Sequence, residues 1–174
     1  QFSSLDNWLL SSLNALVRDV TNAYETYDVL EATRPIEQFV DQLSNWYLRR
    51  SRRRFWKSES DADKAAAYYT LYQALTTISK LLAPTMPFIA EELHQNLVRS
   101  VDSEAPISVH LSDWPTYDES LIDEKLNRDM LTVMRLVSLG HSARNKSNIK
   151  VRQPLAEVAF AVGNVEDQGV VERY

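Results

Sequence analysis

The chain of 174 residues has no cysteine and only three glycines, the first of them Gly140. Without cysteine there are no disulfides and no thiolate metal sites. Without glycine, the region before Gly140 cannot hold a glycine-rich phosphate loop or a nucleophile elbow, which several enzyme classes need. Strand-rich folds also use glycine in their tight turns. The composition therefore favours long helices and argues against a free-standing enzyme.

Long hydrophobic runs are missing as well. No apolar run approaches the roughly 18 residues that span a bilayer, and no signal-peptide pattern opens the chain. We therefore expect a cytoplasmic protein with no membrane partner. Because the chain begins at Gln1 rather than methionine, we also expect it to be a piece of a longer protein.

Histidine is scarce, with one residue in each of three distant regions. Glu91 and His94 share a predicted helix face at a spacing of three, which is a metal-binding spacing in helix bundles. No second pair of this kind accompanies them. We expect a solvated helix face at Glu91 and His94, no metal site, no catalytic residue and no cofactor within this chain.

Apolar residues recur every three or four positions through most of the chain, which is typical of helices that bury one face. The pattern predicts helices over residues 6–27, 35–57, 65–82, 88–98 and 118–144, with Asp6 as the first N-cap. Residues 149–162 alternate small and β-branched side chains, which predicts one or two strands.

These elements predict an all-α fold. We expect an antiparallel bundle of four to five long helices over residues 1–146. Residues 147–174 then form the truncated beginning of a small C-terminal α/β or β segment, so that the bundle is followed by a short α+β start.

Positive charge is concentrated between Ser44 and Lys57, in the sequence SNWYLRRSRRRFWK. The whole chain has a net charge of −5, yet this segment contains no acid. Aromatic side chains flank its arginines. The candidate binding residues of this segment are Trp46, Tyr47, Arg49, Arg50, Arg52, Arg53, Arg54, Trp56 and Lys57.

Two interpretations of this basic segment remain open. Guanidinium groups grip phosphates while planar rings stack on unpaired bases, so the segment suits a folded nucleic acid. Alternatively, the arginines pair with the surplus acids of the same molecule. Helical phase divides them, because Arg50 and Arg54 continue the apolar stripe of the helix while the other arginines flank it. Arginines on such a stripe favour docking against a neighbouring domain.

A second, weaker basic group lies between Ala143 and Leu155. Its acid-free sequence offers further phosphate contacts, although a polar surface loop is the favoured explanation. The candidate residues are Arg144, Lys146, Lys150 and Arg152.

Five sequence phrases, in this order, resemble the anticodon-binding domain of class Ia aminoacyl-tRNA synthetases. They are LDNWLLSSLNALVRDVTNAYETYD (5–28), LSNWYLRRSRRRFW (43–56), LLAPTMPFIAEELHQNL (81–97), SVHLSDWP (108–115) and NIKVRQPL (148–155). Within that class they are most similar to the isoleucyl-tRNA synthetases. The RRSRRRFW and KVRQPL sequences favour these over the valyl, leucyl and methionyl enzymes.

The resemblance implies a helical bundle that binds the anticodon stem and loop of isoleucine tRNA and packs against a catalytic domain. It implies no DNA partner. The family's ATP-binding signatures, HIGH and KMSKS, are absent from this sequence, so ATP and Mg²⁺ belong to the parent enzyme. Three alternatives remain: the basic segment is a docking surface for the catalytic domain, the chain is the same domain of a valyl, leucyl or methionyl enzyme, or the chain is a generic helical scaffold.

Overall fold

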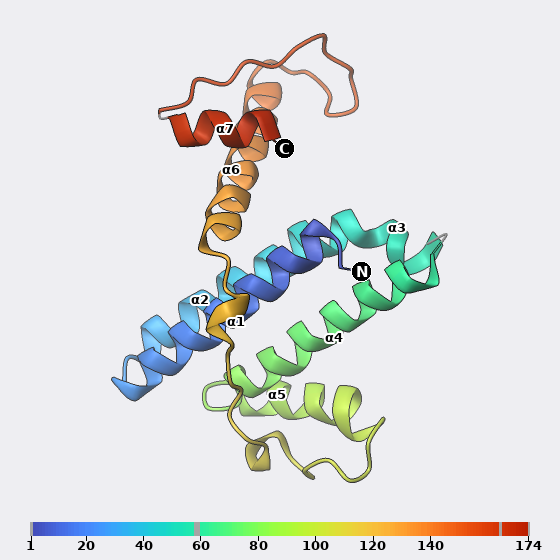
Figure 1. Ribbon diagram of the computed structural model, residues 1–174, viewed down its shortest axis with the longest axis vertical. Helices are drawn as coiled ribbons and strands as arrows, with labels where there is room; N and C mark the ends of the chain where they lie inside the picture. The colour runs from blue at the N-terminus through green and yellow to red at the C-terminus, as the bar shows by residue number, and fades with distance from the viewer. Residues whose placement is uncertain (1, 58–59, 164, 174) are drawn as a thin grey trace. The chain divides into compact units, whose positions relative to one another are not determined.

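The computed structural model describes residues 2–57, 60–163 and 165–173, and the other positions of the predicted ranges 1–146 and 147–174 lie outside the described residues. The described residues form helices and irregular segments and contain no strand (Figure 1). The all-α fold predicted from the sequence is confirmed. Packing divides the chain into two compact units, residues 1–123 and 124–174, whereas the sequence-based boundary after residue 146 stays a prediction.

The first unit begins with helix α1 (Ser4–Glu25), which lies beside helix α2 (Val29–Gln42) (Figure 1). Ser3, not Asp6 as predicted, is the N-cap of α1. The two form a capping box, in which the Asp6 backbone N–H donates to Ser3 Oγ and the Ser3 N–H donates to the Asp6 carboxylate. The capping box begins the helix two residues earlier and leaves Asp6 buried inside it.

Helix α2 continues without a break through a π-helical turn (Leu43–Leu48) into helix α3 (Arg49–Lys57). Pro35 lies inside α2. From Phe39 onward the buried residues follow at a constant spacing of four. They are Phe39, Leu43, Tyr47, Ser51 and Phe55. A π-helical turn holds more residues than an α-helical turn, so it shifts the face that the following residues present to the core.

Helix α4 (Asp61–Leu82) crosses α1 and contacts α3. Helix α5 (Pro87–His94), a π-helical turn (Gln95–Arg99) and short 3₁₀ turns follow. Residues 112–123 then run back along α1 in the opposite direction. Trp114 Nε1 donates to Thr21 Oγ1, the Asp118 N–H donates to Asn14, and the Asp123 N–H donates to Ser11. These contacts fasten the end of the first unit along the length of α1.

The second unit consists of helix α6 (Glu124–Lys146), an irregular segment and helix α7 (Val165–Arg173). Asp129 of α6 accepts hydrogen bonds from Lys125 and Arg173, both at 2.7 Å, and so holds α7 against α6. Residues 149–162 form none of the predicted strands, and the α+β start is not confirmed. A strand needs a neighbouring strand for its backbone hydrogen bonds, and the described residues supply none.

Candidate nucleic-acid interface

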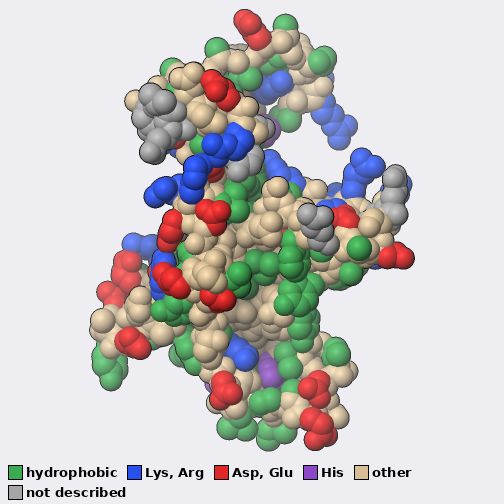
Figure 2. All heavy atoms as spheres, in the orientation of Figure 1, with side chains coloured by type: hydrophobic (Ala, Val, Ile, Leu, Met, Phe, Trp, Pro, Cys, Tyr) green, Lys and Arg blue, Asp and Glu red, His purple; other side chains and the backbone are tan. Residues whose placement is uncertain are grey.

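Helix α3 turns most of its positive charge outward. Five of its basic side chains are exposed, and we refer to them as the cationic face of α3: Arg49, Arg50, Arg52, Arg53 and Lys57. None of the five forms an ion pair with a carboxylate of the residues that the structure describes. Figure 2 shows basic side chains, in blue, projecting at the end of the first unit where α3 lies. These five charges are therefore available to an anionic partner.

Two of these arginines lie over tryptophan rings. The Arg50 guanidinium carbon is 3.2 Å from the centre of the Trp46 ring, and that of Arg52 is 5.8 Å from the centre of the Trp56 ring. Desolvation lowers the pKa of Arg50. Trp56 itself is 74% exposed, so its ring offers a stacking surface beside a cation.

Arg54 differs from the other arginines, because it points into the bundle. Its Nη1 and Nη2 donate to the two carboxylate oxygens of Asp6 at 2.8 and 2.7 Å, and its Nε donates to Asp63 at 2.9 Å. Asp6 is fully buried. The hydrogen bonds to Asp6, and to a lesser degree those to Asp63, raise the pKa of Arg54 despite its desolvation. This arginine ties the start of α1 and the start of α4 to α3.

Tyr47 completes the same network. It is fully buried, and its hydroxyl donates to Asp6 Oδ1 at 2.7 Å. Burial, followed by the hydrogen bond to Asp6, raises the pKa of Tyr47. Burial alone would raise the pKa of Asp6 as well, but the hydrogen bonds from Arg54, Tyr47 and Ser3 lower it to about 2. Tyr47 therefore supports α3 from inside and presents no ring to a base.

The structure thus corrects the sequence-based division of the arginines. Arg54 faces inward as predicted, but Arg50 does not continue the buried stripe, and Ser51 takes that place. The reason is the π-helical turn before α3, which moves the core-facing position by one residue from the one that a regular helix predicts. Self-pairing with acids of the same molecule holds for Arg54, whereas the cationic face remains without such partners among the described residues.

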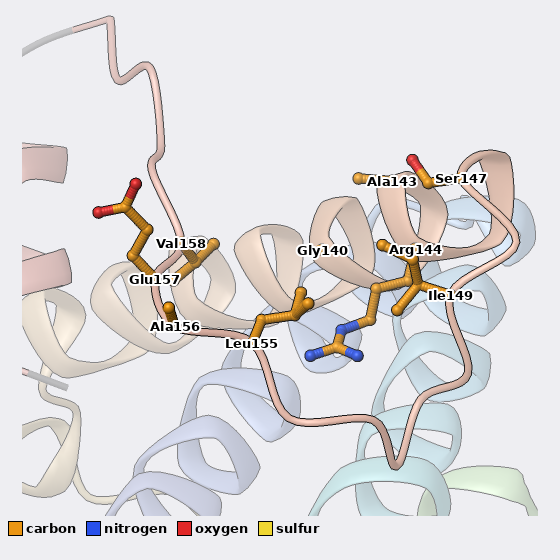
Figure 3. Close-up of a pocket in the computed structure, with 9 residues that line it drawn as sticks. All are labelled: Gly140, Ala143, Arg144, Ser147, Ile149, Leu155, Ala156, Glu157 and Val158. Carbon is orange, nitrogen blue, oxygen red and sulfur yellow. The ribbon is translucent and has the colours of Figure 1, made fainter.

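The second basic group is spread over the end of α6 and the irregular segment after it. Arg144 is used within the fold, because its Nη1 donates to the carbonyls of Lys150 and Gln153 at 3.0 and 2.8 Å. It reaches across a pocket of about 430 Å³ toward the chain that carries Leu155 (Figure 3). Lys146, Lys150 and Arg152 are exposed. Arg144 therefore holds the segment that displays Lys150 and Arg152.

Glu91 and His94 hold a loop. His94 is buried, with Nε2 at 2.8 Å from the Pro106 carbonyl, and Glu91 accepts from the Ser108 hydroxyl and the Val109 N–H. Hydrogen bonds from Gln95 and Ser108 lower the pKa of Glu91. In the part of the chain that the structure describes, no cluster of three or more potential ligands could bind a metal ion, and no helix is long and apolar enough to cross a membrane.

Comparison with known families places the chain. Residues 6–160 match the family described as the anticodon-binding domain of tRNA ligase. The chain belongs to this family. The resemblance found in the five sequence phrases is thereby confirmed. The match runs from the first turn of α1 through α6 and most of the irregular segment after α6, so it includes the cationic face of α3 and the second basic group.

Individual relatives carry the name isoleucine–tRNA ligase. The chain is 60% identical to that of Dehalococcoides mccartyi over 160 residues, which is 92% of this chain. It is 49% identical to the Clostridium tetani protein over 91% of this chain, and 47% identical to isoleucine–tRNA ligase 2 of Bacillus cereus over 96%. The matches span only 15–16% of the relatives' own lengths.

Proposed function

We propose that this chain is the tRNA-binding module of an isoleucine–tRNA ligase and that it binds the anticodon stem and loop of isoleucine tRNA. The observation that carries the proposal is the cationic face of α3, whose charges have no carboxylate partner among the described residues although the chain is acidic. Family membership and the names of the relatives support the choice of tRNA over other polyanions.

The proposed contacts follow from the geometry. Arg49, Arg52 and Arg53 bind phosphates, because guanidinium forks match phosphate oxygens. Trp56 stacks on an unpaired base, because its ring is exposed and lies beside Arg52. Lys150 and Arg152 of the second basic group remain predicted phosphate contacts.

The module has no catalytic role of its own in this proposal. Aminoacylation with ATP and Mg²⁺ takes place in the rest of a longer cytoplasmic protein, and the module positions the tRNA for it. It binds no cofactor and no DNA. The alternative function, docking of α3 on the catalytic domain, is favoured by one observation, the partial desolvation of Arg50 over Trp46.

A binding titration tests the proposal. Fluorescently labelled isoleucine tRNA and a non-cognate tRNA are titrated with the chain at several salt concentrations. We expect tighter binding of the isoleucine tRNA and a log–log salt slope of roughly −0.7 to −0.9 per phosphate neutralised. Equal binding of both tRNAs would refute the specificity. Binding that is absent, or that does not change with salt, would refute the function.

A further inference from the structure

Helix α4 carries three exposed tyrosines within five residues, next to α3. Tyr68 and Tyr69 are each 51% exposed and Tyr72 is 39% exposed. We refer to these three residues as the tyrosine face of α4. Phe2 adds a fourth ring, whose centre is 5.8 Å from that of Tyr69. Figure 2 shows a continuous band of hydrophobic side chains, in green, beside α4.

The tyrosine face adjoins α3. Tyr68 meets Phe55 of α3 edge to face, with ring centres 5.1 Å apart and planes at 87°. The residue after Phe55 is the exposed Trp56. The tyrosine face therefore begins beside the end of α3, the helix that carries Trp56 and the cationic face.

Charge around the tyrosine face suits an anionic partner. The sequence contains no acid between Asp63 and Glu91, although the whole chain has 24 acidic residues. Lys64, one turn before Tyr68, is exposed. The two acids of α4, Asp61 and Asp63, lie in its first turn, and Asp63 is paired with Arg54. The rest of α4 therefore carries no negative charge that would repel a polyanion lying on the cationic face. If the partner were a protein of ordinary composition, the stretch between Asp63 and Glu91 would have no need to lack acids.

We propose that the tyrosine face stacks unpaired bases of the RNA whose phosphates bind the cationic face of α3. This inference rests on the proposed function and adds a surface on a second helix. Tyrosine stacks on any base, so the face contributes affinity for single-stranded nucleotides and no sequence preference of its own. Tyr69 and Tyr72 carry the stacking, while Tyr68 also packs on Phe55.

The experiment compares two RNA probes, an isoleucine anticodon stem-loop and a blunt duplex with the same stem. The variants of the 174-residue chain are Tyr69→Ala, Tyr72→Ala and Tyr69→Phe. We expect each alanine variant to bind the stem-loop roughly 5- to 100-fold more weakly, and Tyr69→Phe to bind like the wild type, because it keeps the ring. Affinity for the duplex and the salt slope stay unchanged, because tyrosine contacts no phosphate.

Tyr27→Asn is the matched control. Tyr27 is 91% exposed at the opposite end of α1, and its φ of 59° suits asparagine. Three outcomes overturn the inference alone: alanine variants that bind the stem-loop like the wild type, a Tyr69→Phe variant as weak as Tyr69→Ala, or an equal loss in Tyr27→Asn. A wild-type chain that binds neither probe overturns the proposed function first, and the inference with it.

Discussion

Arg54 and Asp6 form a two-point ion pair across 48 residues of sequence, with N–O distances of 2.8 and 2.7 Å. The pair joins α3 to the first turn of α1, and Asp63 adds the first turn of α4. A basic helix that displays five charges to solvent is thus anchored by a sixth charge that points the other way. The structural arginine keeps the exposed ones in place.

Removal of the Arg54 charge is expected to destabilise the first unit strongly. Arg54→Met leaves the carboxylate of Asp6 buried without its cation, which costs about 3–5 kcal/mol. The neighbouring Arg53→Met is the matched control, and it should change the free energy of unfolding by less than about 0.5 kcal/mol because Arg53 is exposed. Urea unfolding followed by circular dichroism measures both. Equal effects of the two substitutions would contradict the assigned roles.

The same network predicts an acid dependence of stability. The pKa of Asp6 falls from its ordinary 3.8 to about 2 in the folded state, so ionised Asp6 favours folding above about pH 4. This contribution is lost as the pH falls through about 2, and it amounts to about 2 kcal/mol.

The comparison of wild type with Asp6→Asn isolates that contribution, because all other carboxylates are common to both proteins. The difference in their free energies of unfolding should shrink by about 2 kcal/mol between about pH 5 and about pH 2. A difference that stays constant over this range would show that Asp6 is not the carboxylate with the depressed pKa.

The loop after the second π-helical turn gives a prediction about local order. Arg99 donates to the carbonyls of Ser103 and Ala105, and Gln95 donates to that of Ile107. Arg99→Met removes two of these hydrogen bonds and should speed cleavage of residues 100–107 by a broad-specificity protease severalfold. Arg34→Met, on the exposed side of α2, is the control and should leave the cleavage rate unchanged. Unchanged cleavage in Arg99→Met would mean that other interactions hold the loop.

The sequence predicted the helices well because their apolar stripes are regular. The spacing of Leu9, Leu13, Leu16 and Val20 identifies α1, and all four residues are buried. The strands predicted over residues 149–162 are absent, because an alternating pattern describes a half-buried surface and does not supply the hydrogen-bonding neighbour. Helix α7 was missed, and its sequence contains Gly169, which lowers helix propensity.

The basic segment was also identified from the sequence, but the predicted division of its arginines into core-facing and solvent-facing residues was partly wrong. The extrapolation from Trp46 assumed a regular helix and therefore placed Arg50 on the buried stripe. The π-helical turn has no recognisable signature in LSNWYL, so the shift to Ser51 could not be foreseen. The role of Asp6 was hidden for another reason, since its partner Arg54 is distant in sequence and only tertiary packing brings the two together.

The central claim is that Arg54 holds the fold while the exposed arginines of α3 bind RNA. Its most direct test is the salt dependence of stem-loop binding by wild type and by the triple variant Arg49→Ala, Arg52→Ala, Arg53→Ala. We expect the variant to unfold at the same urea concentration as the wild type but to bind more weakly. The magnitude of its log–log salt slope should fall by about one for each phosphate that the variant no longer neutralises. An unchanged slope with unchanged affinity would show that the cationic face of α3 does not bind RNA.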